Sequence, residues 1–261
     1  MKYRQPEVEE AIHENTCKWM LQDEKYQNWV DYKTGLLWVK GKPGAGKSTL
    51  MAFIYRDLLK EQNGRKGGER HIRLEHFFLG RGFPLQNSNG MFRSLLHQLL
   101  SADWAIRRAI LLEFKGKKLF GVAGKDWNWT DKEMRRLFLE SVLNVAKRRT
   151  ITILVDALDE SGPEAPALVE YFHTLHDKLE KAGTARAVRM CISCRHYPVF
   201  ATTPSLSIVV EDHNIGDIKR YVNENLDSKL DGYLGNFEAA AWQKLKDDVA
   251  DMAFGVSCGL A

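Results

Sequence analysis

A glycine-rich segment near residue 45 constrains this chain more than any other feature of its sequence. It fits the pattern G-x-x-x-x-G-K-[ST] at every fixed position, with an apolar run at residues 36–39 before it and an amphipathic stretch from Ser48 after it. Such a strand–loop–helix context is the one in which this loop holds phosphate groups. The sequence therefore predicts a nucleoside triphosphate site made of Gly41, Lys42, Pro43, Gly44, Ala45, Gly46, Lys47, Ser48 and Thr49.

Each residue type in this loop has a chemical reason. Glycines let the backbone curl so that its N–H groups face the phosphates, and the N-terminus of the following helix adds partial positive charge. The Lys47 ammonium is expected to reach the β and γ phosphates, and the Ser48 hydroxyl is expected to ligate Mg²⁺. The alternative is a chance match in a flexible loop, which the strand before it and the helix after it disfavour.

Short apolar runs alternate with stretches of helical periodicity along the chain. This alternation predicts an α/β fold of three layers, a P-loop NTPase with a parallel five-stranded sheet and flanking helices. Strands are expected at residues 36–39, 71–79, 151–155, 187–193 and 206–210. Helices are expected at residues 6–20, 48–58, 88–99, 104–114, 130–142, 168–179, 215–226 and 238–253, with loops at 62–68 and 116–128.

The order of these segments suggests three parts. Residues 1–35 are expected to form a helical lead-in, residues 36–212 the P-loop nucleotide-binding core, and residues 213–261 a helical C-terminal extension. A capping box of Thr130 and Glu133 opens the helix at 130–142.

Charge and hydropathy restrict the class of partner. Lys and Arg number 38 against 34 Asp and Glu, and we expect the resulting net charge of +4 to be spread thinly along the chain. This indicates a solvated surface rather than a nucleic-acid stripe, so nucleic acid is not an expected partner. No apolar run approaches the roughly 18 residues of a membrane helix. We therefore expect no membrane partner and a cytoplasmic location.

The cysteines are few for a chain of this length. Cys191 and Cys194 have C-x-x-C spacing, but no second pair or histidine cluster accompanies them. The alternative of a metal or redox site is therefore disfavoured. Buried, reduced thiols are expected at Cys17, Cys191, Cys194 and Cys258.

Acidic residues follow the most apolar strand of the chain. Asp156 comes directly after residues 151–155, and Asp159 and Glu160 are close behind. Because ligands of open parallel sheets bind at the carboxyl ends of strands, Asp156 is expected to hold Mg²⁺, directly or through water, beside Ser48. Either Glu160 or Asp159 is expected to orient or deprotonate the attacking water. The alternative is an acidic cluster that only favours a helix N-terminus.

An arginine follows another apolar strand. Arg195 comes after residues 190–194, and its strand end should point at the same edge of the sheet as Asp156. There it is expected to sense or neutralise the γ-phosphate. The alternative is an ion pair with a surface carboxylate. His196 is expected to be a loop residue rather than a ligand.

These segments together resemble the NACHT domains of fungal STAND proteins, the signalling NTPases of non-self recognition and heterokaryon incompatibility. The phosphate loop is common to all P-loop NTPases, whereas the strings Asp-Ala-Leu-Asp-Glu and Arg-His-Tyr-Pro are much more specific. The resemblance covers about four-fifths of the chain and is carried by residues 16–19, 37–51, 77–78, 81–82, 90–96, 154–160, 192–198, 218 and 221–222.

The resemblance implies that Lys47, Ser48, Asp156 and Arg195 take the roles given above. It implies that the strand before Arg195 lies between the Asp156 strand and the phosphate-loop strand. It also implies a switch, in which nucleoside diphosphate holds a closed form and triphosphate permits oligomers that activate an effector. The expected ligands are ATP or GTP with Mg²⁺, hydrolysed slowly. The expected partners are effector and repeat domains, or partner proteins of the parent receptor.

The chain also departs from the family pattern. Relatives usually carry an effector domain before the NACHT region and a winged-helix region and sensor repeats after it, and we recognise none of these here. The winged-helix histidine that clamps the diphosphate in many relatives has no counterpart in the sequence. Residues 253–261 leave the pattern, so we expect a truncated gene product or a fragment.

Two functions from other classes remain open. A small-molecule kinase uses a similar loop but needs an acceptor pocket and usually an arginine-rich lid, whereas the pairs at 107–108 and 135–136 lie on predicted helices. A nucleotide-binding scaffold without turnover would be expected to lose Lys47 or Asp156, and both are present. Phosphate release without an acceptor separates a switch from a kinase.

Overall fold

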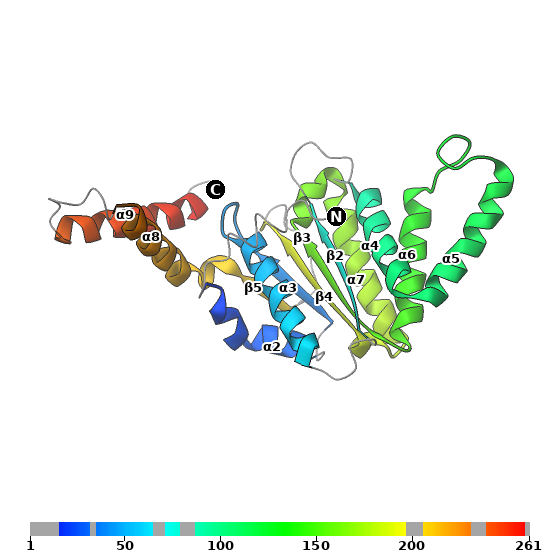
Figure 1. Ribbon diagram of the computed structural model, residues 1–261, viewed down its shortest axis with the longest axis horizontal. Helices are drawn as coiled ribbons and strands as arrows, with labels where there is room; N and C mark the ends of the chain where they lie inside the picture. The colour runs from blue at the N-terminus through cyan, green and yellow to red at the C-terminus, as the bar shows by residue number, and fades with distance from the viewer. Residues whose placement is uncertain are drawn as a thin grey trace.

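Five parallel strands form one sheet in the order β2-β3-β4-β1-β5 (Figure 1). The computed structural model describes residues 16–31, 35–64, 71–78, 87–196, 206–230 and 239–258. The predicted α/β class and the parallel five-stranded sheet are confirmed. The strands are β1 Leu36–Lys40, β2 His71–Phe77, β3 Thr150–Asp156, β4 Val188–Cys194 and β5 Leu206–Val209.

Helices cover both faces of this sheet, which gives the predicted three layers. The α-helices are α2 Glu24–Val30, α3 Lys47–Gly64, α4 Ser88–Ala102, α5 Trp104–Lys117, α6 Asp131–Ala146, α7 Ala165–Lys181, α8 Ile215–Leu230 and α9 Ala239–Cys258. The 3-10 helices are η1 Lys18–Gln22, η3 Lys118–Phe120, η4 Leu158–Glu164, η5 Ala185–Ala187 and η6 Val210–Asp212.

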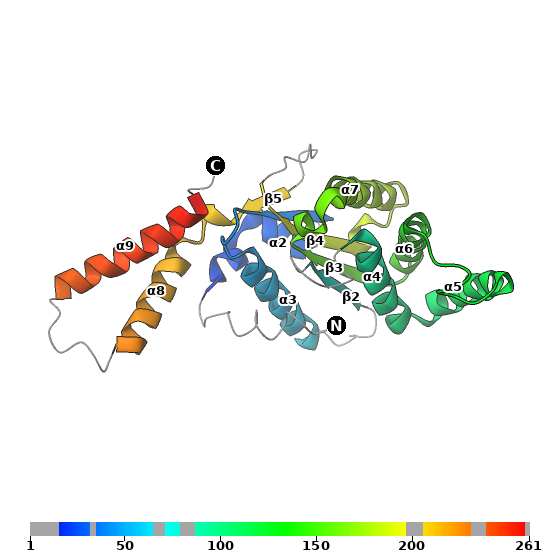
Figure 2. The same ribbon diagram turned by 90° about the horizontal axis from the view of Figure 1, so that it is seen from above.

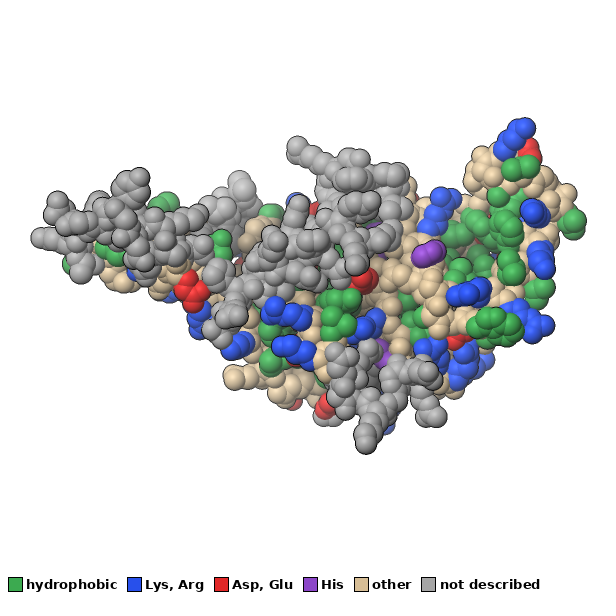
Figure 3. Space-filling view, viewed as in Figure 1, with side chains coloured by type: hydrophobic (Ala, Val, Ile, Leu, Met, Phe, Trp, Pro, Cys, Tyr) green, Lys and Arg blue, Asp and Glu red, His purple; other side chains and the backbone are tan. Residues whose placement is uncertain are grey.

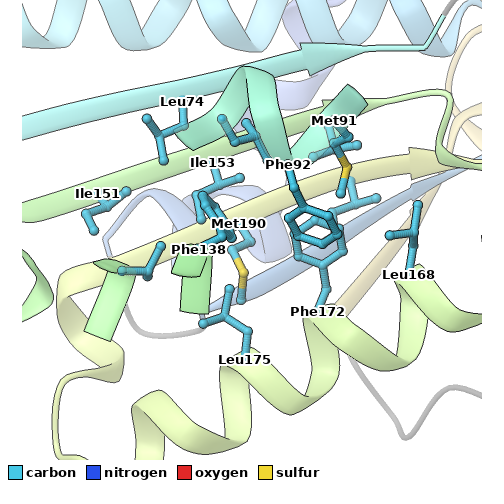
Figure 4. Close-up of a cluster of buried hydrophobic side chains, with 14 of the residues drawn as sticks. Leu74, Met91, Phe92, Phe138, Ile151, Ile153, Leu168, Phe172, Leu175 and Met190 are labelled. Carbon is cyan, nitrogen blue, oxygen red and sulfur yellow. The ribbon is translucent and has the colours of Figure 1, made fainter. Parts of the chain in front are cut away.

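Strands β1, β3 and β4 contribute apolar residues to two cores, one on each face of the sheet, whereas β2 contributes Ile72 and Leu74 to only one of them. Trp38, Ile153 and Met190 point to the core under α4, α6 and α7, which Figure 4 shows with its buried phenylalanines. Their neighbours in sequence, such as Val39 and Leu154, point to the core under α2 and α3. The alternation of side chains along a strand produces this division. It also decides which strand residues lie on the face of the phosphate-loop helix.

The start of the described chain differs from the prediction. A helix was expected through Trp19 and Met20, but these residues lie in η1 and a separate helix, α2, follows. Cys17 has a left-handed backbone with φ of 62°, which ends any helix that enters from before it. Asp23 then caps α2 by accepting hydrogen bonds from the N–H groups of Lys25 and Tyr26. Residues 6–15 of the predicted helix lie outside the described residues.

Other boundaries shift by a few residues. Helix α3 continues to Gly64, so residues 62–64 of the predicted loop are helical. Strand β2 ends at Phe77, and Leu79 lies outside the described residues. The capping box of Thr130 and Glu133 is confirmed, with both of its hydrogen bonds present.

The prediction of buried thiols is confirmed at three of the four cysteines, and the side chain of Cys258 lies outside the described residues. Cys17, Cys191 and Cys194 are buried and unbridged. Cys191 lies in the core beneath α3 and Cys194 in the core on the other face, so the C-x-x-C pair cannot share a ligand. Burial raises the pKa of Cys194 to about 11, which keeps this thiol protonated. Among the described residues, no group of three or more His, Cys, Asp or Glu is placed to hold a metal ion.

The molecule is elongated. The pair α8 and α9 projects from one end of the sheet and α5 from the other, as Figures 1 and 2 both show. None of the described helices is long and apolar enough to cross a bilayer.

Candidate functional site

The phosphate loop leaves the carboxyl end of β1 and enters α3. Gly44 and Gly46 have φ of 79° and 86°, a left-handed backbone that side chains disfavour. At Gly41 space is the constraint, because an added Cβ would lie 3.0 Å from a carboxylate oxygen of Glu211. The sequence pattern is thus required by the local geometry. The curled backbone before a helix N-terminus fits a phosphate group.

Lys47 opens α3 and turns back over the loop. Its Nζ donates hydrogen bonds to the carbonyl oxygens of Gly41, at 2.8 Å, and Lys42, at 2.7 Å. Burial lowers the pKa of Lys47, while Asp159, Glu211 and Asp156 raise it and Arg195 lowers it further. The ammonium is therefore held at the mouth of the loop among more carboxylates than cations.

Strand register brings Asp156 to the face of the phosphate-loop helix. Asp156 ends β3 and is fully buried, two residues beyond Leu154 of the α3-side core. Its Oδ1 accepts a 2.5 Å hydrogen bond from the Ser193 hydroxyl on β4. The same hydroxyl accepts a hydrogen bond from the N–H of Ala157 at 2.8 Å. Ser193 thus fixes both the carboxylate and the turn that follows it.

The turn after Asp156 directs the next two acidic residues. Ala157 has φ of 55°, which is uncommon for a residue with a Cβ. The chain there leaves the sheet sharply and enters η4, where the N–H of Glu160 donates to the carbonyl oxygen of Ala157 at 2.9 Å. Asp159 and Glu160 therefore lie at the same edge of the sheet as Asp156.

Arg195 pairs with one of these carboxylates. Its Nε lies 2.9 Å from Oδ2 of Asp159, and its backbone N–H donates to Oδ1 at 3.1 Å. The Asp159 side chain is 7% exposed and the Arg195 side chain 48%. Arg195 was expected either to meet the γ-phosphate or to form an ion pair with a carboxylate. The ion pair is present, and its partner Asp159 is itself a candidate site residue, so the two alternatives do not exclude each other. The guanidinium keeps a solvent-exposed face at the edge of the sheet.

The structure adds two side chains that sequence reasoning missed. Glu211 of η6 accepts a hydrogen bond from the Lys42 N–H and lies 3.2 Å from Nε2 of His196. Asn214 donates from Nδ2 to the carbonyl oxygen of Ala45 at 2.9 Å. Both come from the chain after β5 and support the loop from outside the motif. No local pattern marks them, since they lie about 170 residues from the loop.

Ser193 allows a direct test of this arrangement. Ser193→Ala should lower the free energy of unfolding by about 1–2 kcal/mol, since it leaves the buried N–H of Ala157 and one oxygen of Asp156 without their partner. Chemical denaturation measures this loss. Ser207→Ala, on the edge strand β5 and partly exposed, is the matched control and should change little. Equal effects of the two substitutions would contradict the bridging role.

This chain is similar in sequence to a known protein family and to a known fungal protein. The family described as Nephrocystin 3, N-terminal, matches residues 15–195. The chain belongs to this family. Vegetative incompatibility protein HET-E-1 of Podospora anserina is 25% identical to this chain over 183 residues, which are 69% of the chain and 12% of HET-E-1. The resemblance to NACHT domains of STAND proteins is thereby confirmed.

Two solved structures are also similar to this chain. Drosophila ORC bound to DNA has a TM-score of 0.47 at 15% identity, over 95% of the chain and 56% of that structure's chain. The Aeropyrum pernix ORC1 protein in complex with DNA has a TM-score of 0.39 at 12% identity, over 87% and 50%. The chain thus spans about half the length of the chains in these two structures and a small part of HET-E-1.

Proposed function

We propose that this chain is the nucleotide switch of a STAND signalling protein, which binds ATP or GTP with Mg²⁺ and hydrolyses it slowly to the diphosphate. The observation that carries the proposal is the strand order. Because β4 lies between β3 and β1, the phosphate loop, Asp156 and Arg195 leave adjacent strands at one edge of the sheet. Phosphoryl transfer needs positioning and charge stabilisation at one such place.

The proposed ligand set follows from the geometry of this edge. Backbone N–H groups of residues 41–49 would hold the phosphates, with Lys47 as the side-chain cation. Ser48 and Asp156 would hold Mg²⁺, directly or through water. The charge balance around Lys47 supports the need for a metal, because Asp156, Asp159 and Glu211 outnumber Lys47 and Arg195. A bound magnesium ion would neutralise phosphate charge that these carboxylates otherwise repel.

Hydrolysis also needs a group that positions water. We assign this role to Glu160, since the Asp159 carboxylate is engaged by the side chain and backbone of Arg195. Arg195, half exposed beside the loop, would meet the γ-phosphate and report its presence through Asp159. Asp159 is the alternative candidate for the general base, and separate substitution of Glu160 and Asp159 tests the assignment.

The kinase alternative finds less support in the described residues. Arg135 pairs with Asp131, and Arg136 pairs with Glu113 and Glu140. Arg107 donates to the carbonyl oxygens of Leu100 and Ser101. These arginines are thus engaged by residues of α4, α5 and α6. The scaffold alternative predicts binding without turnover.

The relative's name suggests the biological setting. HET-E-1 is called a vegetative incompatibility protein. We propose that this chain likewise acts in the cytoplasm, in non-self recognition or cell-death signalling. There its nucleotide state would control assembly with effector and repeat domains or partner proteins of a parent receptor.

A nucleotide-binding experiment tests the switch. The 261-residue protein should bind ADP and a non-hydrolysable ATP analogue within about tenfold of each other, roughly 1.4 kcal/mol, because among the described residues we expect Arg195 and the proposed magnesium ligands to distinguish them. Calorimetry measures both affinities, a chelator should weaken both, and light scattering should show a monomer with each. The same measurements with GTP and GDP show whether the site prefers adenine or guanine nucleotides.

Turnover is measured on the same protein. Phosphate release without an added acceptor supports a hydrolase, whereas release only with an acceptor supports the kinase. Binding with no release supports the scaffold. A stable ring formed only with triphosphate would show that these residues contain the complete switch.

A further inference from the structure

One end of the molecule carries an unusual concentration of exposed apolar side chains. It is formed by α5 and the segment after it, residues 104–128, here called the arm. Leu119 is 86% exposed, Phe120 78%, Trp104 67% and Leu112 64%. Figure 3 shows green and blue side chains gathered over this right-hand end, with little red. Large exposed apolar patches mark places where another surface binds.

The outer face of α5 has the periodicity of a buried face. Trp104, Arg108, Leu111, Leu112 and Lys115 recur at intervals of three and four residues, opposite to Ile106 on the packed side. Apolar residues at such spacing normally face a core. On α5 they face solvent, so the stripe indicates a surface that is covered in the working protein.

The tip of the arm is an ordered turn, held by hydrogen bonds and a ring contact, that leaves its apolar residues exposed. Trp127 turns inward, packs edge-on against Phe114 and donates from Nε1 to the carbonyl oxygen of Gly121 at 3.1 Å. Asp126 accepts a hydrogen bond from the N–H of Val122 at 2.6 Å. The turn is thus fixed from inside, while Leu119 and Phe120 point away from it.

The arm holds the chain's excess of positive charge. It contains six Lys or Arg and two Asp or Glu, a net charge of +4 (six minus two), which equals that of the whole chain. The expectation of thinly spread charge is therefore wrong. The two acidic residues are engaged, Glu113 with Arg136 and Asp126 with Val122. Lys115 and Lys118 are exposed and face outward with the apolar stripe.

We propose that the arm binds an anionic lipid bilayer surface. Lys115 and Lys118 would contact lipid headgroups, and Leu119, Phe120 and Val122 would enter the interface. Basic residues beside exposed Trp, Leu and Phe are the composition of interfacial helices. The arm is convex and lies at the far end from α8 and α9, so a flat surface reaches it without meeting the rest of the molecule (Figure 2).

Other occupants fit less well. Two copies meeting through this face would bring Arg108, Lys115 and Lys118 of each onto the same cations of the other, and like charges disfavour that contact. The expectation of no membrane partner rested on spanning segments. A peripheral contact needs none, so the described helices are compatible with it.

Vesicle flotation of the 261-residue protein tests the proposal. The protein should float with vesicles of 30% phosphatidylserine in phosphatidylcholine, stay behind with phosphatidylcholine alone, and release at high salt. Replacing both Lys115 and Lys118 by Gln should weaken binding about thirtyfold, since each lysine near an anionic surface contributes about five- to sixfold. Phe120→Glu should abolish it.

Matched controls keep the result interpretable. Met252→Glu on α9 removes an apolar side chain that is 63% exposed at the opposite end, and should leave flotation unchanged. Lys219→Gln with Lys244→Gln is the charge control. Thermal unfolding should be equal in all variants. Equal flotation with neutral vesicles, no flotation of the unsubstituted protein, or flotation insensitive to the arm variants would overturn the proposal. So would binding of an acidic amphipathic peptide through these residues without vesicle binding.

Discussion

Lys47→Ala should abolish the stabilisation of this protein by nucleoside triphosphate while leaving the fold intact. Lys47 belongs to neither core, and its Nζ bonds only to the loop carbonyls of Gly41 and Lys42, so the sheet does not depend on it. A ligand at about 100 times its dissociation constant stabilises by about 2.7 kcal/mol. For a chain of this size that is about 5–10 °C in melting temperature.

The matched control lies on the same helix. Lys60→Ala removes an exposed lysine near the far end of α3 and should retain the full nucleotide-induced shift. Differential scanning fluorimetry with and without magnesium nucleotide compares the three proteins. A normal shift in Lys47→Ala would move the phosphate site away from this loop. Loss of the shift in both variants would indicate a general effect of charge.

Glu160→Gln should retain nucleotide binding and lose about a hundredfold in the rate of phosphate release. A general base contributes roughly 10²–10⁴ to a rate, and the amide keeps the size of the side chain while removing its basicity. A hundredfold corresponds to about 2.7 kcal/mol of barrier. Single-turnover phosphate release measures the chemical step, and fluorescence anisotropy of labelled nucleotide shows that binding persists.

Asp159→Asn is the informative comparison. Because Asp159 holds Arg195 by its side chain and backbone, this variant should weaken triphosphate relative to diphosphate and change the rate less than Glu160→Gln does. If Asp159→Asn slowed phosphate release more than Glu160→Gln, the role of general base would belong to Asp159.

Local patterns predict much of this fold. Four of the strands were predictable as short, mainly apolar runs, and β2 was predictable because apolar and polar residues alternate along it. The helix of Thr130 was predictable because its capping box lies within four residues. Helix α2 was missed because its apolar residues, Tyr26 and Trp29, are aromatic and lie among polar neighbours. What makes it a helix is the Asp23 cap and burial against β1 and β5, which is tertiary information.

The candidate site divides in the same way. Lys47, Ser48 and Asp156 follow from motifs at strand ends, and their gathering at one edge follows from the parallel sheet. Ser193 could have been suspected from its place in a strand beside Asp156, had the register been known. Glu211 and Asn214 could not have been predicted, because they are remote from the loop in sequence and come close to it only when β5 pairs with β1. The pairing of Arg195 with Asp159 likewise depends on neighbouring strands that are remote in sequence.

The attachment of α8 gives the phosphate loop a mechanical connection to the end of the molecule. The first turn of α8 is tied at two points, through Asn214 to Ala45 and through Asp217 to the N–H of Cys17 at 2.7 Å. Beyond them the helix extends to Leu230, 16 residues in all, or about 24 Å. A tilt of about 10° at this pivot moves its far end by about 4 Å. Because the contact with Ala45 is close to the pivot and Leu230 is far from it, a small displacement of Ala45 would produce a larger displacement at the far end of α8.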